Sequence, residues 1–86
     1  MSNYVVIKYW RYTDKSVIFE QNKRIDELIE EYDKNIGEIS AIEKIEIFEL
    51  EDDVVGVKQY HIKRVGGNEF KRWYNLEFDT NEEAKQ

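Results

Sequence analysis

The 86-residue sequence contains no cysteine, no proline and a single histidine. Without cysteine the chain forms no disulfide, no cysteine-ligated zinc site and no thiol nucleophile. His61 alone supplies neither a zinc cluster nor a Cys–His pair, so we expect it to be a solvent-facing strand residue. The chain must therefore fold by packing alone, and a reducing cytoplasm is the compartment we expect.

Other functional patterns are missing as well. No stretch approaches the roughly 20 apolar residues of a membrane span, and no signal-peptide pattern is present, so we expect neither membrane insertion nor export. Gly66-Gly67 is followed by neither Lys-Ser/Thr nor a helix, so it is no phosphate loop. Glu51-Asp52-Asp53 lacks the ligand spacing of an EF-hand. We expect no metal, no cofactor and no catalytic residue, and we predict that the protein is not an enzyme.

What is present suits one small globular domain. The content is 41% hydrophobic and 37% charged, with six tyrosines, four phenylalanines and two tryptophans. A chain of this length holds one modest core. We predict one domain over residues 1–79 and a short tail over 80–86 that resembles the start of a helix.

Residues 22–37 have the periodicity of an amphipathic helix. Apolar residues recur there at intervals of three and four: Ile25, Leu28, Ile29, Tyr32 and Ile36. The charged residues from Asp26 to Lys34, including Asp33, are expected on the opposite side. We predict Asn22 as the N-cap and Gly37 as the left-handed residue that ends the helix.

The rest of the chain reads as strands rich in β-branched and aromatic residues. They are predicted over residues 4–12, 17–20, 42–51, 54–65 and 70–78. Short turns between them imply antiparallel pairing, so we predict an α+β fold of order β-β-α-β-β-β, with the helix on one face of the sheet. The alternation in 42–51 changes phase near Phe48, which predicts a β-bulge or a switch of covered face.

The first predicted strand is apolar on both sides. Val5, Ile7 and Tyr9 share one side, whereas Tyr4, Val6, Trp10 and Tyr12 share the other. Because one helix covers one face only, either a second layer covers the outer face or that face is an attachment surface.

Charge is segregated along the chain. The net charge is −6, yet residues 25–53 hold twelve acidic and two basic groups, while residues 1–24 and 54–78 each hold five basic and two acidic groups. Cross-strand pairs of Glu46 or Glu49 with Lys58 or Lys63 would explain part of this segregation and help to set the register.

Two clusters combine aromatic and basic residues. They are Tyr9, Trp10, Arg11 and Tyr12, and Lys71, Arg72 and Trp73 with Tyr74. Such residues serve equally as core packing, as anchors of a protein interface, or as a stacking surface for single-stranded nucleic acid.

We therefore expect a small acidic, cytoplasmic, non-enzymatic protein-interaction module that binds an unidentified protein or itself as a homodimer. An accessory or inhibitor protein of phage type fits by analogy only. The alternatives are a single-stranded nucleic-acid-binding protein and an acidic mimic of nucleic acid. The first seven residues of the two clusters, from Tyr9 to Tyr12 and from Lys71 to Trp73, are the predicted interaction surface.

Overall fold

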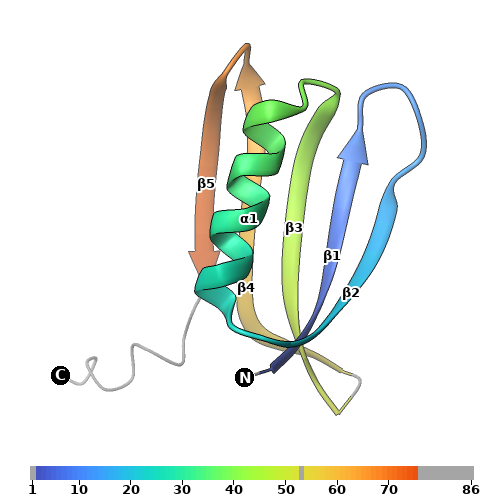
Figure 1. Ribbon diagram of the computed structural model, residues 1–86, viewed down its shortest axis with the longest axis vertical. Coiled ribbons are helices and arrows are strands. Elements are labelled where there is room, and N and C mark those ends of the chain that lie inside the picture. Colours follow the sequence, from blue (N-terminus) through green and yellow to red (C-terminus); the bar gives the residue numbers. More distant parts are fainter. Residues whose placement is uncertain (1, 53, 76–86) are drawn as a thin grey trace, which may run out of the picture.

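The computed structural model describes residues 2–52 and 54–75 as a five-stranded antiparallel sheet with a helix across one face (Figure 1). In chain order the elements are β1 (Ser2–Trp10), β2 (Ser16–Lys23), α1 (Ile25–Glu38), β3 (Ile42–Glu51), β4 (Val54–Gly66) and β5 (Glu69–Asn75). The strand order is β2-β1-β3-β4-β5. The predicted α+β class and element order are confirmed.

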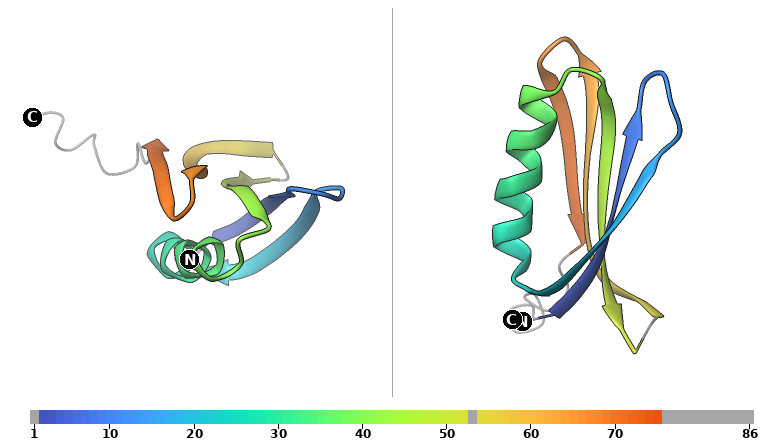
Figure 2. Two further views of the ribbon diagram at one scale, coloured as in Figure 1. Left: turned by 90° about the horizontal axis from the view of Figure 1, so that it is seen from above. Right: turned by 45° about the vertical axis from the view of Figure 1, so that its right-hand side comes forward.

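The helix carries the chain from the edge strand β2 across the sheet to the central strand β3. It contacts β3 and β4 and covers one side of the sheet only (Figures 1 and 2). Because β3 pairs with β1 rather than with β2, the β1–β2 hairpin becomes one edge of the sheet and β5 the other. One sheet face is thus under α1, and the other has no layer over it among the described residues.

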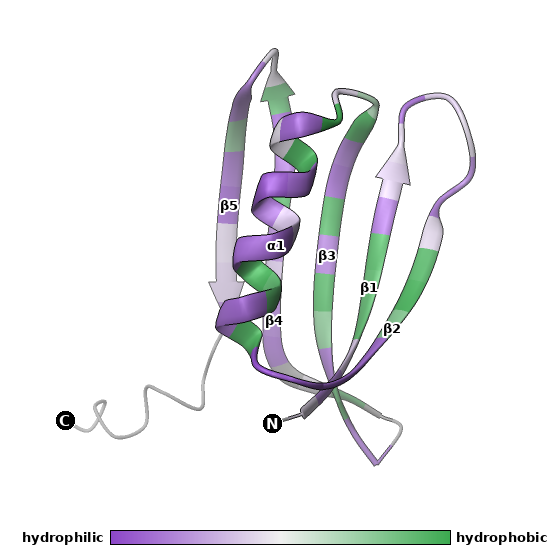
Figure 3. Cartoon of the chain, in the orientation of Figure 1, coloured by the Kyte–Doolittle hydropathy of each residue, from purple (hydrophilic) through white to green (hydrophobic). Residues whose placement is uncertain are grey.

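The core lies between α1 and the sheet. Leu28, Tyr32 and Ile36 of α1 are buried, and its outer side is hydrophilic (Figure 3). The buried sheet partners are Tyr4, Val6, Ile42, Ile45, Ile47, Tyr60 and Ile62. Removing such side chains from water is the main stabilising contribution in a chain of this size. The predicted stripe is confirmed, with Ile25 and Ile29 partly buried at its margin.

The predicted helix ends are wrong. Asn22 belongs to β2, has φ of 56°, and its backbone N–H donates to Oδ1 of Asn3. The N-cap is Arg24, which makes no side-chain cap hydrogen bond, and Gly37 lies inside α1. Asn22 and Gly37 are residue types that commonly cap helices. However, pairing with β1 extends β2 through Asn22, so the helix begins later, at Ile25.

A buried arginine satisfies the end of α1 instead. The side chain of Arg64 on β4 is 7% exposed, and its guanidinium donates to the carbonyls of Ile36 (2.6 Å) and Ile39 (3.1 Å). It also donates to the carbonyls of Ile42 (3.1 Å) and Gly67 (2.6 Å). The last turn of α1 has no basic residue of its own, so Arg64 supplies the cation that suits a helix C-terminus.

Asp33 differs from its predicted place on the solvent side of α1. The Tyr60 hydroxyl donates to Asp33 Oδ1, and Arg72 Nε lies 3.1 Å from Asp33 Oδ2. The residue lies at the flank of the helix, where a short carboxylate reaches the sheet. It ties α1 to β4 and β5.

The predicted irregularity near Phe48 is present, but on the neighbouring strand. Phe48 pairs with Gln59 and Leu50 with Val55, so β4 carries the extra residues, around Gly56. Pairing of β3 with β1 continues without a shift through Phe48, and Glu49 is buried on the α1 side. The apparent phase change arises because both sheet faces are apolar, and only one of them is covered.

The last hairpin follows the predicted turn. Gly67 has φ of +51°, a conformation that glycine adopts without strain, and β5 follows from Glu69. The described part of β5 ends at Asn75. Leu76, Phe78 and the predicted tail lie outside the described residues.

Candidate interaction surface

The sheet face turned away from α1 is called the open face here. Its side chains alternate with the buried ones along each strand, and the register aligns them in rows across the sheet. Hydrophobic members of the open face are Val5, Ile7, Tyr9, Val17, Phe19, Phe48, Leu50, Val55 and Trp73. β1 and β2 each contain a continuous run of hydrophobic residues, so the side under α1 and the opposite side of these strands are both apolar (Figure 3).

Several of these side chains are well exposed. Phe19 is 69% exposed, Val17 51% and Trp73 40%. Phe19 pairs across to Val5, and Val5 to Phe48, so the exposed residues continue into partly buried neighbours. A contiguous apolar surface of this kind is uncommon on a soluble monomer and marks an interaction site.

A ring cluster forms the β4–β5 side of the open face. His61 stacks on Trp73 with ring centroids 5.1 Å apart and an interplanar angle of 5°, and it meets Phe48 edge-on at 5.5 Å. The prediction of a solvent-facing histidine is wrong, because the side chain is only 12% exposed. The histidine is a packing residue here, and it holds the Trp73 ring by stacking against it across the β4–β5 pair.

Glu46 sits at the centre of the same row. It accepts a hydrogen bond from the Tyr9 hydroxyl (2.8 Å), and its Oε2 lies 3.1 Å from Lys44 Nζ and 3.4 Å from His61 Nδ1. Burial raises the pKa of Glu46, but the hydrogen bonds from Tyr9 and Lys44 outweigh it and hold that pKa below its ordinary value of 4.5. The Glu46 carboxylate is therefore paired with groups of the open face itself.

One end of the open face is basic. Lys44 pairs with Lys63, and Lys63 with Lys71, so three lysines align across β3, β4 and β5. Lys44 is engaged by Glu46. Lys63 and Lys71 make no ion pair with any residue of 2–52 or 54–75. The opposite end is the β3–β4 turn, where Glu51 and Asp52 are exposed.

The structure does not bring the seven predicted residues into one surface. Tyr9, Lys71 and Trp73 lie on the open face. Trp10 lies on the α1 side, where it packs against the core and donates from Nε1 to Ser16 Oγ (2.9 Å). Arg72 also lies on that side and pairs with Asp33.

The remaining two lie in the turn after β1. Arg11 pairs with Glu43 through Nε and Oε2 at 2.5 Å, and its guanidinium lies 5.9 Å from the ring centre of Tyr12. Tyr12 is 82% exposed. Neighbours in sequence along a strand alternate between faces, so a four-residue cluster necessarily divides.

Sequence reasoning missed the main contributors to the open face as site residues. These are Val5, Ile7, Val17, Phe19 and Phe48. Their signal was the apolar parity opposite to the core parity in two successive strands. That signal becomes specific only when the pairing of β1 with both β2 and β3 is known.

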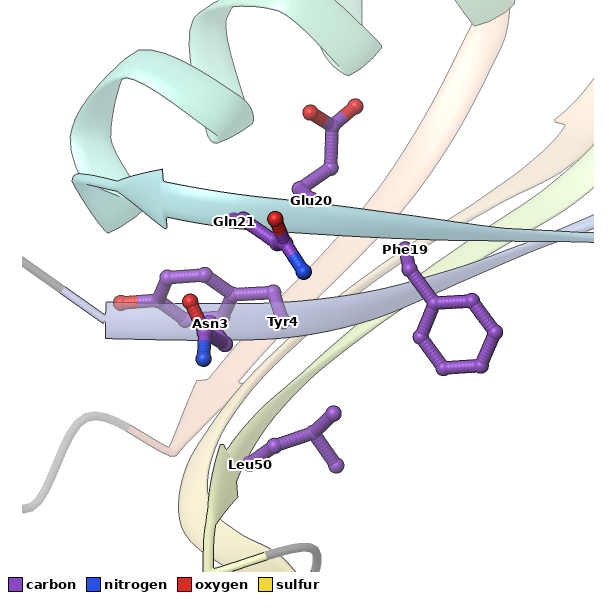
Figure 4. A pocket seen from close by; sticks show the side chains of 6 residues that line it. All are labelled: Asn3, Tyr4, Phe19, Glu20, Gln21 and Leu50. Atoms are coloured by element: carbon purple, nitrogen blue, oxygen red, sulfur yellow. The ribbon is translucent and has the colours of Figure 1, made fainter.

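A pocket of about 160 Å³ opens where β1 meets β2, beside the apolar part of the open face (Figure 4). It is lined by Asn3, Tyr4, Phe19, Glu20, Gln21 and Leu50. Figure 4 shows Glu20 pointing to the α1 side, whereas Phe19 and Leu50 point to the other side. Its lining combines the apolar side chains of Phe19 and Leu50 with polar groups from Asn3, Glu20 and Gln21.

Some carboxylates of the acidic segment 25–53 are paired within the fold. Glu49 is 2% exposed, and its Oε2 lies 3.2 Å from Lys58 Nζ, so this predicted cross-strand pair is confirmed. The pairing of Lys63 with Glu46 is absent from the described part, where Lys63 faces Lys44 instead. The exposed carboxylates are therefore concentrated on the outer side of α1.

Within residues 2–52 and 54–75 no group of three His, Asp or Glu side chains is arranged to hold a metal ion. Over the same ranges no helix has the length and apolar content needed to cross a membrane. The chain matches no family model, no curated protein and no solved structure.

Proposed function

We propose that this chain is a small non-enzymatic protein-interaction module that binds its partner through the open face. The observation that carries the proposal is the exposed apolar surface on the uncovered side of a five-stranded sheet, centred on Val5, Val17 and Phe19. Burying such side chains in a protein contact gains the free energy that the monomer forgoes by leaving them in water.

The composition of the surface supports a protein partner. Most of its side chains are aliphatic or aromatic, and the charged group at its centre, Glu46, is paired with Lys44, while the other charged groups are at the margin. The Trp73 ring is held by stacking on His61. Interfaces have this arrangement of an apolar centre within a polar rim, with Trp and Tyr enriched. A phage-type accessory or inhibitor protein that acts by contact fits this description by analogy only.

One observation favours single-stranded nucleic acid as a second candidate. The lysines at positions 44, 63 and 71 lie in one row next to Trp73, so cations and a stacking ring share the open face. The net charge of −6 opposes it, because a polyanion meets repulsion everywhere except at that row.

Site-specific photo-crosslinking tests the proposal. A photoreactive phenylalanine analogue is placed at Phe19 on the open face and, as a matched control, at Glu30 on the exposed side of α1. In a lysate of the source organism, position 19 should give covalent adducts with polypeptide and position 30 should give none. Adducts with nucleic acid alone, or none from position 19, would contradict the proposal.

A further inference from the structure

Three lysines stand in one row across the basic end of the open face. Lys63 on β4 pairs directly with Lys44 on β3 and with Lys71 on β5. Like charges directly opposite each other in a sheet repel and destabilise the pairing. Glu46 offsets the charge of Lys44, which it meets at 3.1 Å. No carboxylate in the described part of the chain pairs with Lys63 or Lys71, and both side chains are exposed.

From this row we infer that the partner of the open face is a polypeptide segment that combines apolar residues with carboxylates. This inference rests on the proposed function and states the chemistry of its partner. The partner's apolar residues cover Val17 and Phe19, and its Asp or Glu side chains lie between Lys63 and Lys71. Each carboxylate then meets two cations, and the repulsion between the lysines is relieved on binding.

The lysine row differs from the other basic residues of the described part. The chain holds 19 acidic against 13 basic residues, so carboxylates are in surplus, yet none pairs with Lys63 or Lys71. Glu69, two residues before Lys71 on β5, makes no ion pair with it. Three further lysines lack a carboxylate within the described residues, but none of them stands opposite another lysine: Lys8, Lys15 and Lys34. The row is therefore open to the carboxylates of a partner.

The surroundings of the row favour carboxylates of a polypeptide over the phosphates of nucleic acid. One face of the Trp73 ring stacks on His61. The Tyr9 ring is engaged by Lys44, whose Nζ lies 4.8 Å from the ring centre. Successive bases need free ring faces on which to stack. A polyanion is also repelled along its length by a net charge of −6, whereas a largely apolar segment brings only a few charges.

The spacing of the open face indicates how the partner is arranged. The lysine row crosses β1 at Tyr9, four residues from Val5, which pairs with Phe19. Four residues of extended chain span about 14 Å. The exposed apolar residues lie on β2 at one edge of the sheet, and the two unpaired lysines lie on β4 and β5 towards the other. The partner therefore carries its apolar residues and its carboxylates in separate patches, and the acidic outer side of α1 is across the sheet from both (Figure 2).

Charge reversal tests the inference with purified protein and a labelled random copolymer of glutamate and tyrosine as the probe. Lys63→Glu and Lys71→Glu should each weaken binding of the copolymer by on the order of tenfold in fluorescence anisotropy. The matched control is Lys34→Glu on the exposed side of α1, which gives the same net charge. It should change the affinity by less than about twofold, because charges distant from the contact are screened. Equal losses in all three variants, or no binding by the parent, would overturn the inference.

The same variants report on repulsion in the free chain. Lys63→Glu replaces two like-charge pairs by two opposite-charge pairs, so its thermal unfolding midpoint should rise by a few degrees. Lys34→Glu creates no such pair and should not raise the midpoint. A midpoint of Lys63→Glu below that of the parent would show that the row carries no uncompensated repulsion, and would overturn the inference.

Carbodiimide coupling separates this inference from the proposed function. The reagent joins an amine to a carboxylate in contact with it. In the adduct formed at position 19 in the lysate, it should link Lys63 or Lys71 to Asp or Glu of the trapped polypeptide, as read by mass spectrometry. An adduct without such a link leaves the proposed function intact and overturns the acidic partner.

The remaining outcomes concern both proposals. If position 19 gives no adduct with polypeptide, both are wrong. If a labelled single-stranded oligonucleotide binds the purified protein more tightly than the copolymer does, the acidic partner is overturned in favour of nucleic acid.

Discussion

Arg64 is the residue on which the end of the helix most depends. Its planar guanidinium reaches carbonyls from α1, from the start of β3 and from the last hairpin, and it lies over the Phe70 ring at 5.1 Å. A helix C-terminus leaves carbonyls without intrahelical partners, and buried ones are costly if left unpaired. This single side chain therefore substitutes for the glycine cap that the sequence suggested.

Replacing Arg64 by lysine should destabilise the fold by about 3 kcal/mol, because a compact ammonium with three donors cannot span four carbonyls. Chemical denaturation of the variant and the parent measures the difference. The matched control is Arg24→Lys, whose ion pair with Asp26 is exposed and should contribute less than about 1 kcal/mol. Equal stability of Arg64→Lys and the parent would show that these carbonyls are satisfied without Arg64.

Single residues were the hardest part to predict from sequence. Nothing in the pattern Ile62-Lys63-Arg64 distinguishes a buried arginine from an exposed one, because its carbonyl partners are 3 to 28 positions away. His61 was expected in solvent for the same reason, since its stacking on Trp73 needs the β4–β5 register. Asn22 has the chemistry of a cap but is used in a strand.

At the scale of elements, α1 was predictable because an apolar stripe of 3.6-residue period has few other uses. Leu28 at its centre is fully buried. Leu28→Ala should cost roughly 2–5 kcal/mol, a large part of the stability of so small a domain. Thermal or denaturant unfolding checks it, with the exposed Glu30→Ala as control at less than about 0.5 kcal/mol. Coincident unfolding curves for Leu28→Ala and the parent would contradict the packing of α1.

Two tyrosine–carboxylate hydrogen bonds fasten α1 to the sheet. Tyr32 on α1 donates to Glu20 on β2 (2.6 Å), and Tyr60 on β4 donates to Asp33 on α1. Burial first, and then the neighbouring carboxylate, raises the pKa of both phenols above the ordinary 10.0. The folded state therefore holds these protons more tightly than the unfolded state.

The sign of the pH dependence follows. Stability from the two phenols is fully present below pH 10.0 and is lost as the pH rises through their folded-state pKa values. In an alkaline titration followed by tyrosinate absorbance, Tyr32→Phe or Tyr60→Phe should each remove amplitude from the last-titrating class. Loss of amplitude from the first class instead would show that the substituted phenol is exposed.

The strands were predictable as elements, but their faces were not. The turns at 13–16 and 66–68 fixed two hairpins, while the position of β3 beside β1 is a long-range choice. Without the pairing of β3 with β1, Val17 and Phe19 would be interpreted as one side of an ordinary strand. With it, they join the exposed apolar residues of the open face.

For the whole molecule, the uneven distribution of charge sets what the open face can bind. The lysine row attracts a polyanion locally, but the net charge of −6 repels it. Titration with a labelled single-stranded oligonucleotide should therefore show weak binding that declines steeply as salt is raised. Lys63→Glu should abolish it. Micromolar binding at physiological salt that is lost on Trp73→Ala would favour the nucleic-acid alternative.

The central claim is that the open face is a protein-contact surface. Fluorescence of Trp73 reports on it in a Trp10→Phe background, because Trp73 lies on that face and is 40% exposed in the single chain. On titration with the polypeptide that crosslinks to position 19, its emission should shift to shorter wavelength, whereas Phe19→Asp should keep the long-wavelength emission throughout. An emission maximum that stays constant and identical in the two proteins would contradict the claim.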